Sequence, residues 1–507
     1  MIDGTELETV FGTRGSEWHW QDGGTIDLAR SDVELRLQDL TGFAGRCDAI
    51  LLSPDLEYTP PDDAPAAWRR ELLGIPEEPA FAGEFDLVVV GGGSAGMTTA
   101  AAAGKYGLRV ALVQNRPVLG GNASTEVRVG YTGRGMIDPY PNLGRLTDVT
   151  HWSYRQRVAG EPFHGVPLDD HIAEIDRRRL ALLESAGVEL FLNWHVNDVE
   201  TGPDGRIVKV IAQNIVDSRL MSVRGRWFAD CTGDGNLGFL VGADYDMAFI
   251  RMGRTNLSHW QDREEPTSFP RAPWALDLSE KPFPGREGEW ESPDHRFRNV
   301  SGWYWESGFK HDPFERGEYI RDWNFRATFG AWDTLKNVDD SETYRKRELR
   351  WMAYISGMRE SRRLLGDLIL TVQDLKQARE YPDGIIPTSW RLDIHLPHPH
   401  FQEGFKGDEF ISWAPRPNSF YPMPYLIPYR TLYSRNIPNL FMAGRNISVT
   451  SQALGAVRVM WTTGMMGEVV GMAAYLCDKH DTDPRGLFPD HIEELKGLAE
   501  VGVPGIE

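Results

Sequence analysis

A glycine cluster directly after an apolar stretch constrains the fold of this chain more than any other feature. Gly91, Gly93 and Gly96 follow the segment DLVVV with the spacing GxGxxG and precede MTTAAAAGKYG, a run of small residues. In such a turn the first glycine permits a tight bend, the second lets the backbone approach a pyrophosphate, and the third allows close helix–strand packing. Because a second apolar strand, RVALV, follows, the sequence predicts a dinucleotide-binding βαβ unit rather than a glycine turn in an ordinary α/β domain.

The charge and hydropathy of the chain exclude several other classes of protein. Its 507 residues include 54 Lys and Arg against 74 Asp and Glu, a formal net charge of −20. Nucleic acids and anionic membranes attract basic surfaces, so we expect neither as a partner. We also expect no signal peptide and no membrane span, because we find neither a basic and apolar leader nor an apolar run of about 18 residues. The three cysteines form no CxxC motif, which favours a reducing, cytoplasmic location.

Hydrophobic periodicity predicts further elements along the chain. We expect residues 1 to about 60 to be β-rich, followed by a linker that is dense in proline and acidic residues. The predicted helices cover about 171–186, 317–336, 341–365 and 452–477, and the predicted strands are VELFLNWHV, IVKVIAQNIV, RLMSVRG, RWFADCTG and NLFMAG.

Three segments resemble FAD enzymes of the glutathione-reductase and fumarate-reductase type. RPVLGGNASTEVRVG (116–130) is similar to the glycine-rich loop after the second strand, and ADCTGDGNLGFLVGA (229–243) to the turn beside the flavin. The segment from NLFMAGRN to GMAA (439–474) resembles the closing strand and helix. More narrowly, RPVLGGNAS together with GMRESRRLLGDLILT (357–371) resembles a group of bacterial FAD-dependent oxidoreductases. The resemblance covers about 85–480 and implies FAD as the cofactor.

A second GxGxxG, formed by Gly233, Gly235 and Gly238, lacks a following βαβ unit because an irregular, Trp-rich region comes next. We interpret it as a flavin-facing turn, so the chain is expected to lack a nicotinamide domain of its own. The resulting prediction is an α/β fold: a Rossmann-like FAD-binding domain, split in sequence, with an inserted substrate or cap domain and a small β-rich N-terminal extension. The predicted bounds are 1–80 for the extension, 81–245 and 431–480 for the FAD-binding domain, 246–430 for the cap and 481–507 for the tail.

The resemblance also assigns cofactor contacts to particular residues. Gln114 and Asn115 stand where a dinucleotide fold usually has an acidic residue for the ribose. The sites that the resemblance implies are Gly91, Gly93, Ser94, Ala95 and Gly96 for the pyrophosphate; Gln114, Asn115 and Arg116 for the ribose; Gly120, Gly121, Asn122, Ala123 and Ser124 for the flavin edge; His195 and Val196 for the adenine side; Thr232, Gly233 and Asp234 beside the cofactor; and Gly444, Arg445, Asn446, Gly455, Ala456, Val457 and Arg458 in the closing segment, the last four opening the final helix.

Candidate catalytic residues lie in two further segments. In SWRLDIHLPHPH, His395 suits a general base, and Asp393 two positions earlier would orient it if both lie on one strand. His398 and His400 are nearby, but this spacing is no established metal signature, so we expect no metal. The alternative to a catalytic role for His395 is that this segment is a loop of exposed histidines. Arg359 and Glu360 begin a charged stretch that includes Arg362 and Arg363. On the predicted helix, one of these arginines could hold a polar substrate by paired hydrogen bonds. The alternative is a surface helix whose charged side chains form salt bridges with one another.

Other residues could line the substrate side. Glu126, Arg128 and Tyr131 follow the GGNAS loop, and they could instead pack on the cap. Tryptophans between 246 and 430 suit either a sugar-like ligand or the core of a loop-rich cap. The arginines at 116, 128, 359, 362, 363, 445 and 458 predict a locally basic site on an acidic protein.

The function that we expect is hydride transfer from a polar hydroxylated small molecule, with a sugar or glycoside as one candidate, to flavin N5. The sequence does not identify the electron acceptor, and it leaves open whether the chain forms a homo-oligomer. A monooxygenase or halogenase fed with reduced flavin is one alternative, although the halogenase motif is missing. A non-catalytic or RNA-modifying flavin module is another, and the charge of −20 weighs against RNA.

Overall fold

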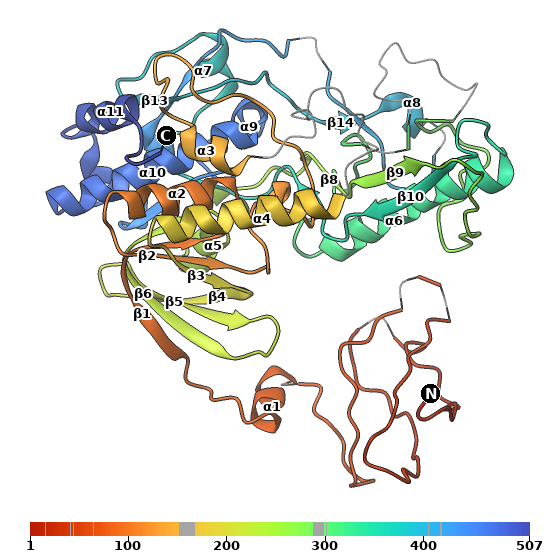
Figure 1. Ribbon diagram of the computed structural model, residues 1–507. Helices are drawn as coiled ribbons and strands as arrows, with labels where there is room; N and C mark the ends of the chain where they lie inside the picture. Colours follow the sequence, from red (N-terminus) through yellow and green to blue (C-terminus); the bar gives the residue numbers. More distant parts are fainter. Residues whose placement is uncertain are drawn as a thin grey trace.

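A seven-stranded sheet carries the dinucleotide-binding part of the chain (Figure 1). The computed structural model describes residues 1–507 apart from 16, 41, 44, 64, 152–167, 287–298, 301, 404, 416, 417 and 507, and it does not describe the side chains of 65, 66 and 168–172. The strands run in the order β3-β2-β1-β6-β5-β4, and β17 also pairs with β6. Their bounds are β1 Ala80–Val90, β2 Val110–Gln114, β3 Glu189–Leu192, β4 Trp194–Thr201, β5 Ile207–Asn214, β6 Leu220–Asp230 and β17 Leu440–Met442.

Parallel pairing brings distant segments into one sheet. Strands β3, β2, β1 and β6 are parallel neighbours, and β17 lies parallel to residues 228–230 of β6. Strands β5 and β4 continue the sheet in antiparallel fashion. The first strand and the closing segment, about 350 residues apart in sequence, therefore share one sheet, which confirms the predicted Rossmann-like α/β fold split in sequence. RLMSVRG and RWFADCTG form the single strand β6 rather than two.

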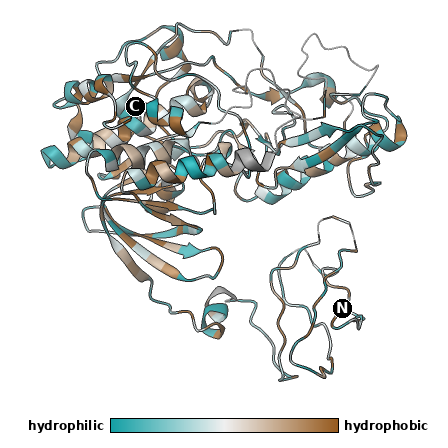
Figure 2. Cartoon of the chain, in the orientation of Figure 1, coloured by the Kyte–Doolittle hydropathy of each residue, from teal (hydrophilic) through white to brown (hydrophobic). Residues whose placement is uncertain are grey.

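Helices of small and apolar residues cover one face of this sheet (Figure 1). Helix α2 (Ser94–Lys105) packs along α10 (Met460–His480), and both carry almost uniformly buried side chains. Figure 2 shows the hydrophobic colour concentrated in the sheet below them. Their neighbours on this side include α3 (Arg145–Thr150), α4 (Leu168–Ser185) and α11 (Ile492–Val501), whereas α5 (Asn236–Val241) packs against β4 and β6. The chain also forms α7 (Val372–Lys376) and α9 (Ser451–Val457). Within the described ranges, none of the helices is long and apolar enough to cross a membrane.

Close backbone approach holds α2 against α10. A Cβ on Gly467 would stand 2.2 Å from the carbonyl oxygen of Ala95, so only glycine fits there. The carboxylate of Glu468, the next residue, is fully buried and accepts hydrogen bonds from the backbone N–H groups of Gly144 (2.8 Å), Leu146 (3.1 Å) and Thr147 (3.3 Å). Glu468 thereby ties α10 to the N-terminus of α3.

Burial makes Glu468 a source of pH-dependent stability. Burial raises its pKa from 4.5 to about 7, against the opposing effect of the three N–H groups. Between these values the folded chain retains a proton that the unfolded chain releases, so native stability falls as pH rises from 4.5 to 7 and then levels off. At about 1.36 kcal/mol per pH unit, the loss is about 3 kcal/mol. Glu468→Gln cannot titrate, so urea unfolding should show the variant gaining about that much on the wild type across this window. A variant-to-wild-type difference that is constant with pH would contradict the assignment.

The predicted cap, 246–430, contains many short elements around its own aromatic core. Trp332, Tyr344 and Leu335 are completely buried there, together with Trp305 and Phe410. The elements are β7 Tyr245–Asp246, β8 Arg254–Thr255, β9 Ser258–Asp262, α6 Gly317–Asp333, a π-helical turn Thr334–Val338, β10 Arg347–Met352, β11 Gly357–Met358, β12 Arg363–Leu364, β13 Gly384–Pro387, β14 Leu396–Pro397, α8 Pro399–Gln402, β15 Ser412–Trp413 and β16 Leu426–Pro428.

Two further sequence predictions of secondary structure were wrong. The predicted helix 341–365 is instead β10, β11 and β12, which pair with β9, β8 and β7; these tertiary partners override the helical pattern. The N-terminal segment is not β-rich. Its described residues up to 60 contain only isolated bridges from Ile2, and Leu37 and Leu40 stay about two-thirds exposed because they find no partner strand. After this segment comes α1 (Pro65–Leu72).

Candidate functional site

A cavity of about 580 Å³ lies between the glycine cluster and the cap. On the sheet side it contacts residues of all the predicted cofactor segments: Gly91, Gly93, Ser94, Ala95, Gln114, Asn115, Arg116, Gly120, Gly121, Asn122, His195, Val196, Thr232, Gly233, Asp234, Gly444, Arg445 and Arg458. On the cap side it is lined by Arg254, Pro313, Phe314, Gly317, Glu318, Arg321, Tyr354, Ile355, Ser356 and Met358. The remaining predicted residues, Gly96, Ala123, Ser124, Asn446, Gly455, Ala456 and Val457, lie behind this lining.

The glycine cluster forms the turn that the sequence predicts. Gly91 has φ +103°, and a Cβ there would stand 2.5 Å from the carbonyl oxygen of Cys231. A Cβ on Gly96 would stand 1.8 Å from the oxygen of Gly91. Gly93 is different: its nearest neighbour would be the Cα of Gly121 at 3.8 Å, so its missing side chain leaves room on the cavity side. Helix α2 begins after Gly93 and presents the N-terminal residues Ser94 and Ala95 to the cavity.

A buried arginine, absent from the sequence-based candidates, holds the GGNAS loop. The side chain of Arg179, on α4, has no exposed surface, and it donates to the carbonyl oxygens of Leu119 and Ala123 at 2.9 Å each. The loop itself pairs with the first turn, since the N–H of Gly120 donates to the oxygen of Gly92 (2.8 Å). Helical spacing from Ile175 and Leu182 puts Arg179 on the buried face of α4, away from Arg177 and Arg178, but only the tertiary structure places that face under the loop.

Gln114 lines the cavity, and its side-chain amide also bonds the glycine turn. Its Oε1 accepts from the N–H of Gly92 (2.8 Å), and its Nε2 donates to the oxygen of Val118 (3.1 Å). The buried amide thus braces the glycine turn, which leaves Asn115 and Arg116 as the more accessible polar groups at this end of the cavity. Arg116 itself is paired with Glu126 at 3.1 Å.

The turn after β6 is built around Asp230. This fully buried carboxylate accepts from the hydroxyl of Thr232 (2.7 Å) and from the N–H of Gly238 (2.9 Å), which fixes the second GxGxxG. A short helix, α5, follows instead of a second βαβ unit. Asp234 faces the cavity and pairs with Arg445 at 3.0 Å.

The closing segment differs from the prediction in one respect. Gly455, Ala456 and Val457 end the short helix α9, and Arg458 follows it, so none of them opens the final helix. The helical conformation is interrupted at Arg458 and Val459, and α10 then starts at Met460. Met460 and Thr463, which lie in the first turn of α10, both line the cavity. The break places a second helix N-terminus beside the cavity, and α2 is anchored to it because the hydroxyl of Ser94 donates to the oxygen of Met460 (3.1 Å).

A buried charge network adjoins Arg458. His395 is 3% exposed; its Nδ1 lies 2.7 Å from Glu306 Oε2 and its Nε2 lies 3.4 Å from Asp393 Oδ2. Arg458 Nη2 donates to the same Asp393 oxygen at 3.2 Å. Of these residues only Arg458 lines the cavity, so His395 and Asp393 lie one side chain behind its wall. The predicted Asp393–His395 contact is present, although residues 391–395 form no strand. Glu306 comes from the irregular cap and was not among the predicted residues.

Both carboxylates of this network stay ionised. Burial opposes ionisation of Glu306, but the charge of Arg359 and the hydrogen bonds from His395 and Ser412 hold its pKa at about 2. Burial likewise opposes ionisation of Asp393, and the hydrogen bond with His395 and the charge of Arg458 lower its pKa well below the usual range. His395 therefore lies between two carboxylates, Glu306 at Nδ1 and Asp393 at Nε2.

The predicted charged helix proves to be extended chain with separate partners. Arg359 is buried, lies 3.3 Å from Glu306 and donates to the oxygen of Trp303 (2.8 Å). Glu360 is buried and pairs with Arg363 at 2.7 Å while accepting from the N–H of Met252. Neither Arg359 nor Glu360 lines the cavity. Arg359 therefore belongs to the His395 network, whereas Glu360 belongs to the packing of the cap.

Of the residues after the GGNAS loop, Arg128 packs on the cap, whereas Glu126 and Tyr131 contact the FAD-binding part. The guanidinium of Arg128 stacks on Trp351 at 4.0 Å, and Tyr131 packs with Ala123 and Trp461. Arg362 stacks on Phe314 at 3.7 Å. None of Glu126, Arg128, Tyr131 and Arg362 lines the cavity.

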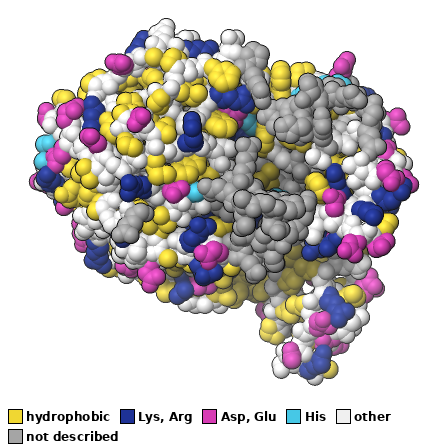
Figure 3. All heavy atoms as spheres, turned by 45° about the horizontal axis from the view of Figure 1, so that its top comes forward, with side chains coloured by type: hydrophobic (Ala, Val, Ile, Leu, Met, Phe, Trp, Pro, Cys, Tyr) yellow, Lys and Arg dark blue, Asp and Glu magenta, His cyan; other side chains and the backbone are white. Residues whose placement is uncertain are grey.

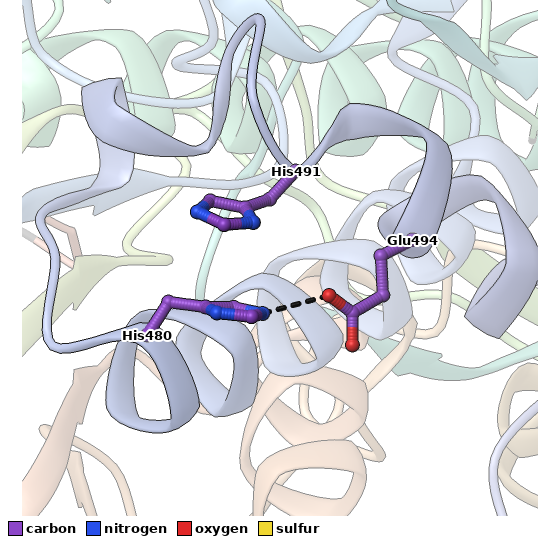
Figure 4. Close-up of side chains that lie close together, drawn as sticks. All are labelled: His480, His491 and Glu494. Atoms are coloured by element: carbon purple, nitrogen blue, oxygen red, sulfur yellow. Dashed lines mark hydrogen bonds and ion pairs between the residues drawn. The ribbon is translucent and has the colours of Figure 1, made fainter.

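Possible metal ligands gather at a different place. Within the part of the chain that the structure describes, the group close enough to share an ion is His480, His491 and Glu494, whose ligand atoms lie within 4.8 Å of one another (Figure 4). Glu494 bonds His480 through one oxygen (2.7 Å) and Lys479 through the other, and the two imidazole rings stack at 3.8 Å. Because both carboxylate oxygens are engaged, we interpret this group as a tie between α10 and α11.

A cavity at the N-terminus of α2, bounded by a GxGxxG turn, defines a dinucleotide-binding protein. The chain matches the family of FAD dependent oxidoreductases over residues 86–497 and belongs to that family. Its cofactor is FAD. The residues present fit this cofactor, because Gly93 leaves the space that a side chain would fill and the N–H groups of α2 open toward it.

Solved structures that the chain matches include a geranylgeranyl bacteriochlorophyll reductase-like protein from Thermoplasma acidophilum (11% identity, 83% of this chain and 84% of that chain, TM-score 0.35). Others are the flavin-dependent brominase Bmp2 (14%, 82% and 85%, 0.37) and the myxobacterial FAD-dependent chondrochloren halogenase CndH (14%, 81% and 78%, 0.36). Similarity at this level carries no information about the substrate.

Proposed function

We propose that the protein is an FAD-dependent dehydrogenase or oxidase of a polar hydroxylated small molecule, a sugar or glycoside being one candidate class. The observation that carries the proposal is the buried histidine between two ionised carboxylates beside the cavity wall. Bound FAD supplies the hydride acceptor. The chain supplies the cavity, the polar groups that orient the substrate and the group that accepts the hydroxyl proton.

In this proposal the cofactor contacts follow the family pattern. Gly91, Gly93, Ser94 and Ala95 hold the pyrophosphate, Asn115 and Arg116 lie at the ribose, and His195 and Val196 lie at the adenine. The flavin end is bounded by Asn122, Asp234 and Arg445. Aromatic residues Phe314 and Tyr354 add apolar surface to the cap side.

His395 accepts the proton at Nε2, the nitrogen with the longer contact. Glu306 fixes the ring through Nδ1, and the negative charge of Asp393 stabilises the imidazolium that forms. Arg458, which pairs with Asp393 at 3.2 Å, is the member of this network that lines the cavity, so in the proposal the proton reaches Nε2 past its side chain. The three cysteines are free thiols, which supports a reducing, cytoplasmic location.

Anaerobic reduction of the bound flavin tests the proposal. Purified protein should be yellow, and a panel of sugars, glycosides, polyols and hydroxy acids should contain members that bleach the flavin absorption. Bleaching by NAD(P)H alone, followed by oxygen consumption, would replace the proposal with a monooxygenase. A protein that binds flavin but is reduced by no member of the panel would also contradict it.

A further inference from the structure

The cavity wall carries more positive than negative side chains. Five arginines line it, against two carboxylates. Four of the arginines have a carboxylate partner within 4.0 Å: Arg116 with Glu126 (3.1 Å), Arg321 with Asp322 (3.0 Å), Arg445 with Asp234 (3.0 Å) and Arg458 with Asp393 (3.2 Å). The fifth, Arg254, has none among the residues that the structure describes.

Arg254 is nevertheless largely removed from water. Its Nη2 donates to the carbonyl oxygen of Pro313, while its Nε is buried and has no hydrogen-bond partner. Burial lowers the pKa of its guanidinium. The charges of Asp234 and Asp312 act on Arg254 from beyond ion-pair distance, and burial still outweighs them, so an anion in direct contact within the cavity would lower the cost of its desolvation.

The backbone fixes Arg254 on the cap side of the site. Its N–H and C=O both pair with Ser307, and across the β8–β11 ladder it lies opposite Met358. The carbonyl oxygen of Met358 in turn accepts from Asn122 (2.7 Å) and from Arg445. Arg254 is therefore connected to the residues assigned to the flavin end, and not to the ribose end formed by Asn115 and Arg116.

We propose that Arg254 binds a carboxylate of the substrate, so that the substrate class is a hydroxylated carboxylic acid such as a hydroxy acid or sugar acid. This inference rests on the proposed function for the assignment of the cavity as the oxidation site. The planar guanidinium offers a fork that matches a carboxylate. The other anion that could reach the cavity is the cofactor pyrophosphate, for which the N-terminus of α2 already provides N–H donors.

Equilibrium binding to the oxidised, FAD-loaded protein tests the proposal. Matched pairs of probes, glucuronate against glucose and lactate against propane-1,2-diol, are titrated while the flavin spectrum and tryptophan fluorescence are followed. We expect at least one acid to bind about 10- to 100-fold more tightly than its neutral partner, the effect of a charged hydrogen bond. Arg254→Gln should abolish that preference with unchanged FAD content, and Arg254→Lys should keep part of it. Arg435→Gln, which removes a half-exposed partner of Asp244, is the control and should behave as wild type.

The outcomes separate this inference from the proposed function. Equal binding of acids and neutral partners, or no saturable binding of any acid, overturns it even when a neutral polyol reduces the flavin. Loss of FAD affinity in Arg254→Gln with an intact preference for acids assigns Arg254 to the cofactor and also overturns it. Tight, Arg254-dependent binding of an acid that never bleaches the flavin supports the subsite and counts against the dehydrogenase instead.

Discussion

Replacing His395 with Gln is expected to slow the reduction of the bound flavin by substrate about 10²- to 10⁴-fold, the usual contribution of a positioned general base. Gln can still donate a hydrogen bond toward Glu306, so the buried carboxylate keeps a partner. It cannot accept a proton at neutral pH. The flavin content should therefore stay at the wild-type level while the reduction rate in anaerobic stopped-flow experiments falls. Free imidazole should partly restore the rate of His395→Ala, which a merely structural role would not produce.

His311→Gln provides a matched control. His311 also pairs with a carboxylate, Asp408 at 2.7 Å, but it lies in the cap and does not line the cavity. Its removal should leave the reduction rate within about threefold of wild type. If His395→Gln behaves like this control, His395 is part of the packing and the proposed proton acceptor is wrong.

The parts of the molecule that were predictable from sequence are those specified by local backbone geometry. Gly91 and Gly96 sit where a Cβ would collide with the backbone, so the glycine spacing reports the turn directly. The continuous apolar residues of β1 and β6 likewise predict buried strands. Such features need no knowledge of distant residues.

The charge network could not be predicted because its members are distant in sequence. Glu306 and His395 are 89 residues apart and meet only because the cap folds between them. Arg254 becomes a candidate only because the structure shows no carboxylate within 4.0 Å of its guanidinium among the residues that it describes. The same dependence on tertiary contacts explains the helix wrongly predicted at 341–365, where pairing with β7, β8 and β9 decides the conformation. Basic and acidic side chains are interspersed over the face seen in Figure 3.

Gly93→Val is expected to remove flavin from a protein that still folds. Gly93 has φ −72° and ψ −174°, a conformation open to valine, and the new Cβ would meet nothing closer than 3.8 Å. The added methyl groups enter the space beside the N-terminus of α2 that the cofactor needs. The ratio of flavin to protein absorbance should fall at least tenfold, and added FAD should no longer raise the unfolding free energy, a gain of about 2.7 kcal/mol for wild type at 100 times the Kd.

Two further glycines make this result interpretable. Gly497, in α11, has open space around its missing Cβ, so Gly497→Ala should keep its flavin and gain about 0.5–1 kcal/mol in stability. Gly96→Ala forces a contact of 1.8 Å with the oxygen of Gly91, so it should lose the fold together with the flavin. Circular dichroism and urea unfolding of the flavin-free proteins distinguish these cases. A yellow Gly93→Val protein with a normal flavin ratio would show that the cofactor does not approach this turn, because no other position of the GxGxxG motif combines free space with access to the cavity.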